Sequence, residues 1–192
     1  MEHQFRRTLA TTLGALALAG CNGAAPGPDQ QAVRHYGELA FTPCTLTAPY
    51  LTTNVEAQCT TYEVAEDPAR PEGRKVALNI AWLPATNEGA ATDDPVFFLA
   101  GGPGQAATEL AAQINAGLRE VRRQRDIVLV DQRGTGASAP LACPELAGTG
   151  TTYPDAAVRA CRERLAQQAD LSRYTTADTV ADLQAVRAAL GH

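Results

Sequence analysis

The sequence contains few of the residues that most often carry catalysis. Its 192 residues include two serines, Ser138 and Ser172, and three histidines. A nucleophilic serine of the G-x-S-x-G type needs a glycine on each side, so that the chain turns sharply and exposes the hydroxyl. Ser138 has only the first of these glycines and Ser172 has neither. These 192 residues therefore contain no serine with the surroundings of such a nucleophile.

The chain also lacks an excess of positive charge and a long apolar run. Its formal net charge is −5, which gives no indication of a nucleic-acid partner. Four arginines lie on the polar side of a predicted helix, where we expect solvent around them: Arg119, Arg122, Arg123 and Arg125. The apolar run at residues 9–20 is too short to span a bilayer. No cysteines have C-x-x-C spacing, and beyond that run only His35 and His192 remain, so no metal or other cofactor is predicted.

Residues 1–20 resemble the export signal of bacterial lipoproteins. Arg6 and Arg7 precede the apolar run, which ends in the lipobox-like sequence L-A-G-C at residues 18–21. The resemblance implies cleavage before Cys21 and a lipid on its sulfur. The protein would then be exported and anchored to a membrane, facing the periplasm or the cell exterior. An ordinary secretory signal or an apolar N-terminal helix is the alternative.

The remaining residues are predicted to divide into a flexible tether, residues 21–38, and a folded domain, residues 39–192. The start of the tether is rich in glycine, proline and alanine and too poor in apolar side chains to pack. The domain contains four cysteines, which allow three pairings. Export normally leads to oxidation, and proximity in the sequence favours the pairs Cys44–Cys59 and Cys143–Cys161. Buried, reduced cysteines are the alternative.

A β-α-β unit forms the centre of the predicted fold. Residues 96–99 and 127–130 are short apolar runs, each followed by a glycine-containing turn, as in buried parallel strands. Between them, apolar residues recur with the spacing of one helix face, at Leu110, Ile114, Leu118 and Val121. We therefore expect two central strands joined by a crossover helix.

Further strands and helices are predicted on either side of this unit, which makes the fold class α/β. Residues 60–65 and 75–83 are expected to form an antiparallel hairpin, because apolar side chains alternate along the second segment. A later helix opened by Pro154 has an apolar face of Val158, Cys161 and Leu165. A last helix is predicted at residues 176–190, before Gly191. Thr175 and Asp178 form its capping box, and its apolar stripe consists of Val180, Leu183, Val186 and Leu190.

The turns after the two central strands carry distinctive residues. The first reads A-G-G-P-G at residues 100–104, and the second reads D-Q-R-G-T-G-A-S at residues 131–138. Ligands collect at the carboxyl ends of parallel strands. In this order and spacing the two motifs resemble those of the prolyl and tripeptidyl aminopeptidase branch of the α/β-hydrolase family. That family usually has a histidine where this chain has Ala100.

The resemblance implies a serine-type aminopeptidase built on the N-terminal portion of an α/β-hydrolase fold, with an incomplete sheet and a peptide as substrate. The N–H groups of Gly101 and Gly102 would form part of the oxyanion hole, and Pro103 would stiffen the turn. The other residues implied to shape the site are Gly104, Asp131, Gln132, Arg133 and Gly134. We expect Asp131, Arg133 and Ser138 to form a buried network of hydrogen bonds and ion pairs beneath the site.

In that family the nucleophile elbow, the cap and the rest of the triad would follow residue 192, so we expect this chain to be the front part of such an enzyme and inactive alone. The strand at residues 96–99 would then be an open edge prone to self-association. One alternative is a dinucleotide-binding oxidoreductase, with Gly102 and Gly104 at the phosphates and Asp131 at the ribose. Another is a catalytically silent lipoprotein. The oligomeric state is not predicted.

Overall fold

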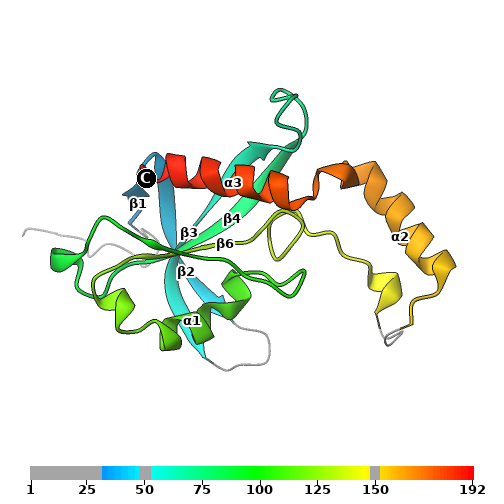
Figure 1. Cartoon of the computed structure of the whole chain (residues 1–192). Coiled ribbons are helices and arrows are strands. Elements are labelled where there is room, and N and C mark those ends of the chain that lie inside the picture. Colours follow the sequence, from blue (N-terminus) through cyan, green and yellow to red (C-terminus); the bar gives the residue numbers. More distant parts are fainter. Residues whose placement is uncertain (1–31, 48–52, 148–151) are drawn as a thin grey trace, which may run out of the picture. The chain divides into compact units, whose positions relative to one another are not determined.

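The computed structural model describes residues 32–47, 53–147 and 152–192. Within these ranges the chain forms a six-stranded sheet flanked by helices (Figure 1). The strands are β1 (Arg34–Tyr36), β2 (Leu39–Thr47), β3 (Asn54–Ala65), β4 (Lys75–Leu83), β5 (Val96–Phe98) and β6 (Ile127–Val130). The helices are α1 (Ala111–Gly117), α2 (Asp155–Gln168) and α3 (Thr176–Ala189). The predicted signal segment and Cys21 lie outside the described residues.

The sheet combines an antiparallel part with one parallel pair, in the order β1-β2-β3-β4-β6-β5. Strands β1 to β4 pair antiparallel in succession, β4 pairs antiparallel with β6, and β5 pairs parallel with β6. The predicted hairpin and the parallel β-α-β unit are therefore confirmed. Strand β6 is central as expected, and β5 lies at an edge of the described sheet, as expected for the strand at residues 96–99 in this chain. The sheet also begins earlier than residue 39, because Arg34–Tyr36 lies within the expected tether and pairs with β2.

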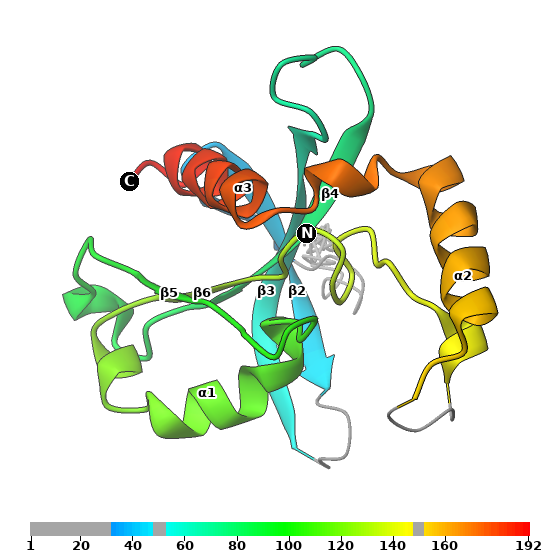
Figure 2. The same ribbon diagram turned by 45° about the vertical axis from the view of Figure 1, so that its right-hand side comes forward.

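Two apolar cores lie on opposite faces of the sheet, because successive side chains of a strand point to opposite sides. Helix α1 covers one face, and its Ala111 and Ile114 pack with Leu83, Ile127 and Leu129. Helix α3 covers the other face, on which the buried residues include Phe41, Leu78, Ile80, Val128, Val130, Val186 and Leu190. Figure 2 shows the two helices on either side of the sheet. Strand β6 is buried on both faces, which explains its continuous run of apolar residues.

The crossover between β5 and β6 is less helical than predicted. Helix α1 has only seven residues, and short 3₁₀ turns at Thr108–Leu110 and Val121–Arg123 flank it. The predicted solvent exposure of the arginine group is wrong for Arg122. This half-buried side chain donates from Nε to the carbonyl of Pro84 at 2.9 Å, and burial lowers the pKa of its guanidinium.

Helix α3 has the predicted cap but a different buried stripe. Thr175 accepts a hydrogen bond from the N–H of Asp178, as the capping box requires. The expectation that Val180 is buried is wrong, because its exposed fraction is 52%. The buried stripe instead follows residues four apart, namely Asp178, Asp182, Val186 and Leu190. Val186 and Leu190 are buried as predicted, whereas the two acidic members could not be found from an apolar pattern.

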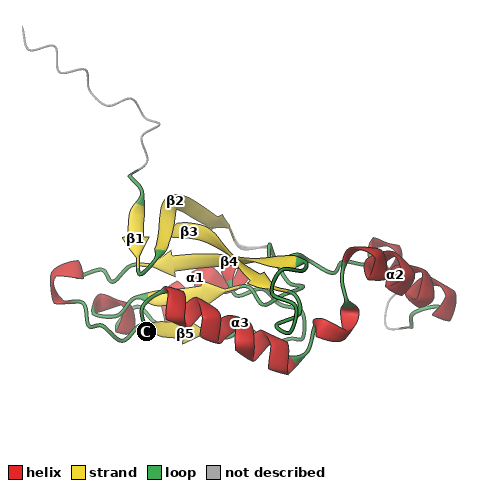
Figure 3. Ribbon diagram, turned by 90° about the horizontal axis from the view of Figure 1, so that it is seen from above, coloured by secondary structure: helices red, strands yellow, loops and turns green. Residues whose placement is uncertain are grey.

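Helix α2 lies apart from the sheet (Figure 3), and a disulfide joins it to the preceding loop. The predicted pairs Cys44–Cys59 and Cys143–Cys161 are both present, with Cα atoms 5.8 and 5.7 Å apart. Cys161 and Leu165 are buried as predicted, whereas Val158 is 42% exposed. Two disulfides are typical of a protein that folds in an oxidising compartment outside the cytosol. None of the described helices is long and apolar enough to cross a membrane.

Candidate functional site

The two motif turns meet at one end of the sheet. Because β5 and β6 run parallel, with Phe98 opposite Leu129, their carboxyl ends lie side by side. Residues from both turns line an open hollow of about 410 Å³: Ala100, Gly101, Gly102, Pro103, Gly104, Gln105, Gln132 and Thr135. The sequence-predicted residues Asp131, Arg133 and Gly134 are not part of this lining. The hollow therefore combines all five residues of the first motif with Gln132 and Thr135 of the second.

The first motif, residues 100–104, forms an exposed turn with few internal contacts. Gly102 has a φ of +126°, a conformation that side chains rarely tolerate. The turn is held by a bond from the N–H of Gln105 to the carbonyl of Gly101, at 3.2 Å, and by one from Gln132 Nε2 to the carbonyl of Ala100, at 2.9 Å. No hydrogen bond among the described residues uses the N–H of Gly101 or Gly102. Two backbone donors beside the hollow are thus available to a ligand.

Asp131 lies beneath the hollow and not in it. Its side chain is fully buried. Oδ1 accepts from the N–H of Thr108 at 2.9 Å, and Oδ2 accepts from Asn79 Nδ2 at 2.9 Å and from the N–H of Ala137 at 3.3 Å. The hydroxyl of Thr108 also reaches both oxygens. One carboxylate thereby joins β4, the start of the crossover and the second turn.

The same burial contradicts the dinucleotide alternative. A ribose-binding acid must present a free oxygen to the ligand. Asp131 has no exposed surface, and the protein's own donors already occupy both of its oxygens. We therefore reject Asp131 as a nucleotide ligand.

Ser138 is also a structural residue. It is fully buried, its hydroxyl donates to the carbonyl of Asp131 at 2.7 Å, and its Oγ accepts from the N–H of Asn79 at 2.8 Å. Ser172 lies on a different segment, where its hydroxyl donates to Asp170 at 2.6 Å. Neither hydroxyl lines the hollow, so neither can attack a group bound there.

Arg133 forms the most extensive ion pair of the described residues. Its Nε and Nη2 atoms each bind an oxygen of Asp182 at 2.6 Å, and both side chains are at least 95% buried. Nη1 donates to the backbone carbonyls of Glu66 and Arg173, at 2.9 and 2.8 Å. Burial alone would lower the pKa of Arg133, but the hydrogen bonds and charge of Asp182 outweigh burial and raise it. Bidentate geometry and further acceptors compensate the desolvation of this charge.

The chemistry of the hollow follows from its lining. None of the lining side chains is ionisable, and backbone N–H groups and two glutamine amides supply its polar character. The described residues include no group of three or more His, Cys, Asp or Glu arranged to hold a metal ion. Neutral donors of this kind suit the oxygen of a carbonyl, particularly one that acquires negative charge during a reaction.

Sequence reasoning missed several partners of the second motif. Thr108 and Asn79 satisfy Asp131, and Asp182 neutralises Arg133. The sequence contained one indication of these partners. Asp178 and Asp182 lie four residues apart on α3, in line with Val186, and two acids in line with a buried apolar residue indicate a buried cation as their partner.

Comparison with known proteins supports a relation to peptidases. The chain is similar to the tripeptidyl aminopeptidases of Streptomyces lividans and Streptomyces coelicolor strain A3(2), with 28% identity to each over 153 residues. The match covers 70% of this chain and 28% of the length of each relative. The chain therefore spans little more than a quarter of these relatives. No protein-family model matches it. This similarity indicates a peptidase-like relation.

Proposed function

We propose that the described domain is the oxyanion-binding part of an exported serine-type aminopeptidase with an α/β-hydrolase fold. The observation that carries the proposal is the hollow at the carboxyl ends of β5 and β6, beside which Gly101 and Gly102 have unused N–H groups. The similarity to two tripeptidyl aminopeptidases supports the same reaction class. A peptide is then the substrate, and its scissile carbonyl oxygen is the group bound in the hollow.

In this proposal the first turn stabilises charge that develops on the carbonyl oxygen. When a hydroxyl attacks a peptide carbonyl, the oxygen becomes negative, and fixed N–H donors bind it more strongly than they bind the ground state. Loss of one such donor costs about 3 kcal/mol of transition-state stabilisation. Gln132 restrains the peptide group that carries the N–H of Gly101, because it holds the Ala100 carbonyl of the same group. The second turn supports this arrangement from below.

The proposal also requires a nucleophile that residues 1–192 do not provide. Both serines are engaged elsewhere, and His192 binds the hydroxyl of Tyr36 at 3.0 Å. The attacking serine, its histidine and the orienting acid would come from other residues, so the 192-residue chain is expected to be inactive alone. Lipid on Cys21 would anchor the mature protein to the membrane.

A serine-reactive fluorophosphonate tests the assignment of the nucleophile. The purified 192-residue chain should show no adduct by intact-mass spectrometry. A product translated through the coding sequence downstream of residue 192 should be labelled and should release tripeptides from tripeptide p-nitroanilides. Labelling of Ser138 or Ser172 would contradict the proposal, and so would a longer product that neither reacts nor hydrolyses.

A matched pair of substitutions in that longer product tests the oxyanion role. Gly101→Pro deletes one N–H, whereas Gly101→Ala retains it, and a Cβ atom at this position meets nothing within 4 Å. Loss of the donor should lower kcat by about 10² to 10³-fold, with little change in the thermal midpoint. Gly101→Ala should remain within roughly fivefold of the parent rate. Equal rates for the two variants would remove Gly101 from the mechanism.

A further inference from the structure

A second hollow, of about 540 Å³, lies between the β3–β4 hairpin and the segment that connects α2 to α3. Its lining includes three small residues, Gly73, Ala166 and Ala169. Three arginines stand around it: Arg70 and Arg74 from the hairpin and Arg162 from α2. We call it the arginine-rimmed hollow. It contributes no residue to the candidate site described above.

The acidic residues that line this hollow are already satisfied by the protein. Glu66 is 5% exposed, and its carboxylate binds Arg74 at 3.0 Å and the N–H of Asp170 at 2.9 Å. Asp67 is 7% exposed and binds Arg70 at 2.8 Å and Arg173 at 3.0 Å. The carboxylate of Asp170 accepts from the backbone and hydroxyl of Ser172. The charges of Glu66 and Asp67 are therefore turned toward the protein, whereas the Asp170 side chain is 38% exposed and its Oδ2 lies 3.8 Å from Nη2 of Arg70.

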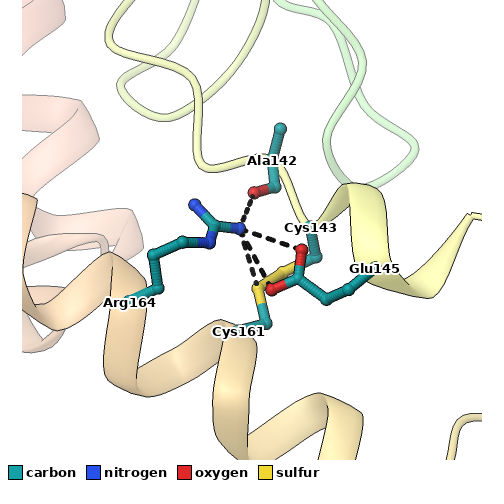
Figure 4. The surroundings of a disulfide bond; sticks show 5 residues. All are labelled: Ala142, Cys143, Glu145, Cys161 and Arg164. Carbon is teal, nitrogen blue, oxygen red and sulfur yellow. Dashed lines mark hydrogen bonds and ion pairs between the residues drawn. A yellow bond between two sulfur atoms is a disulfide. The ribbon is translucent and has the colours of Figure 1, made fainter.

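The arginines, in contrast, retain unused donors that reach solvent. The side chains of Arg70 and Arg74 are 70% and 49% exposed, and each uses only part of its guanidinium on the acids. Arg162 makes no hydrogen bond or ion pair with any residue that the structure describes. Its neighbour Arg164 differs, because it donates to the carbonyl of Ala142 at 2.8 Å and to Glu145 (Figure 4). Helix α2 therefore carries one arginine with a structural role, Arg164, and two residues before it one with free donors, Arg162.

The walls of the hollow are held in place from behind. Arg133 donates to the carbonyls of Glu66 and Arg173, which joins the hairpin to the segment before α3. The disulfide Cys143–Cys161 fixes α2 to its preceding loop, one residue from Arg162. The arginines are therefore presented from restrained backbone, which lowers the conformational entropy lost when a ligand binds.

We propose that the arginine-rimmed hollow binds an oxyanion group, a carboxylate or a phosphate, through the free donors of Arg162, Arg74 and Arg70. The planar guanidinium fork matches the paired oxygens of both groups. The hollow, of about 540 Å³ with small residues in its lining, has room for such a group. The binding does not depend on the peptidase proposal, and it is measured on the 192-residue chain.

The test is titration of the purified chain with sodium phosphate and, separately, with N-acetylglycine. The buffer has low ionic strength and contains no other carboxylate, phosphate or sulfate. Signals of the arginine side-chain N–H groups in ¹⁵N-resolved spectra report the binding. At least one probe should bind saturably, with Kd on the order of 1 mM. Arg162→Gln should weaken it roughly tenfold, and it should not unfold the protein because Arg162 has no partner among the described residues. The matched control is Arg159→Gln on the same helix, which should not change the affinity. Among the residues that the structure describes, Arg159 pairs only with Asp155, at 3.9 Å.

The two probes distinguish the sources of the group. Saturation by phosphate alone assigns the hollow to phosphorylated ligands, and saturation by N-acetylglycine alone assigns it to free carboxylates such as a peptide C-terminus. Weakening of either by added NaCl is expected, since exposed charges are screened. Absence of saturable binding by both probes would overturn the proposal. Equal affinity in the parent chain and the Arg162→Gln variant would also overturn it.

Discussion

The two turns that follow β5 and β6 are neighbours in space but differ in how their polar groups are used. In the first turn, residues 100–104, the N–H groups of Gly101 and Gly102 have no partner among the described residues. In the second turn, residues 131–138, Asp131, Arg133 and Ser138 are buried and bonded through every polar atom of their side chains. One turn is open to a ligand and the other is closed.

The difference shows how this chain holds an open turn in a fixed place. Unsatisfied donors are tolerated only where solvent or a ligand can reach them, so the first turn must lie at the surface. Its position then depends on the second turn, to which the bond from Gln132 to the carbonyl of Ala100 connects it. Substitutions should therefore affect stability strongly in the second turn and weakly in the first.

The largest effect is expected from removal of Arg133. Arg133→Met leaves the buried Asp182 carboxylate without a counter-charge and two backbone carbonyls without a donor. Loss of one partner of a buried pair costs about 3–5 kcal/mol in unfolding free energy. Urea unfolding measures the change. The control is Arg125→Met, whose exposed pair with Asp94 should contribute less than about 1 kcal/mol, and equal losses for both variants would contradict the comparison.

The next largest effect is expected at Gly136 in the second turn. Its φ is +51°, and a Cβ atom there would meet the Asp131 carboxylate and the Cβ atom of Ala106 at distances too short for contact. Gly136→Ala should lower the unfolding free energy by about 2–3 kcal/mol. Gly117→Ala, at a helical position with nothing within 4 Å, is the control and should be neutral or stabilising in the same denaturation series.

A smaller effect, which should depend on pH, is expected at Asp67, next to the Glu66 carbonyl that Arg133 binds. The hydrogen bond from Arg70, followed by that from the N–H of Ala69, lowers the pKa of Asp67 below its ordinary value. A lowered folded-state pKa stabilises the protein above the unfolded value, near pH 4, and this contribution is lost as pH falls through the folded pKa. Asp67→Asn should therefore lower the thermal midpoint at pH 7, by an amount that shrinks on acidification below about pH 4. A constant difference across that range would contradict this assignment.

The smallest effect is expected in the first turn. Gly101 does not have a positive φ, and an added Cβ atom meets no neighbour. Gly101→Ala should change the unfolding free energy by no more than about 0.5–1 kcal/mol, in the stabilising direction. The matched glycine of the second turn is Gly134, where a Cβ atom would lie 3.0 Å from the ring of Tyr174 at a φ of +83°. Gly134→Ala should therefore have a lower thermal midpoint than Gly101→Ala. Equal midpoints, or a higher one for Gly134→Ala, would contradict the comparison.

Local patterns predicted the strands and disulfides but not the buried charges. The hairpin strand Lys75–Leu83 and strand Ile127–Val130 have the predicted bounds, because alternation and a continuous apolar run are visible within a few residues. The disulfides close separations of only 15 and 18 residues. In contrast, Arg133 and Asp182 are 49 residues apart, and Asp131 and Thr108 are 23 apart. Such pairings depend on how the elements pack, which is also why Val180 was expected to be buried and is not.

The candidate site, too, was predicted only in part, because local patterns show its turns but not how the elements pack around them. The glycine turn and Gln132 lie beside the hollow as their motifs suggested, because the carboxyl ends of parallel strands meet at one edge. Sequence could not separate the outward Gln132 from the inward Asp131 and Arg133, since all three belong to one motif. Their different burial depends on which elements pack against them, because Asp131 binds Thr108 just before α1 and Arg133 binds Asp182 of α3, on the other side of the sheet.

Amide hydrogen exchange of the 192-residue chain tests the central claim most directly, that one turn offers free N–H groups on a fully bonded support. The N–H of Gly134 binds the carbonyl of Ser138 at 2.7 Å, and the N–H of Thr108 binds Asp131 at 2.9 Å. These amides should exchange at least roughly a hundredfold more slowly than those of Gly101 and Gly102, relative to the intrinsic rate of each. Protection of Gly101 and Gly102 equal to that of Gly134 and Thr108 would contradict the account.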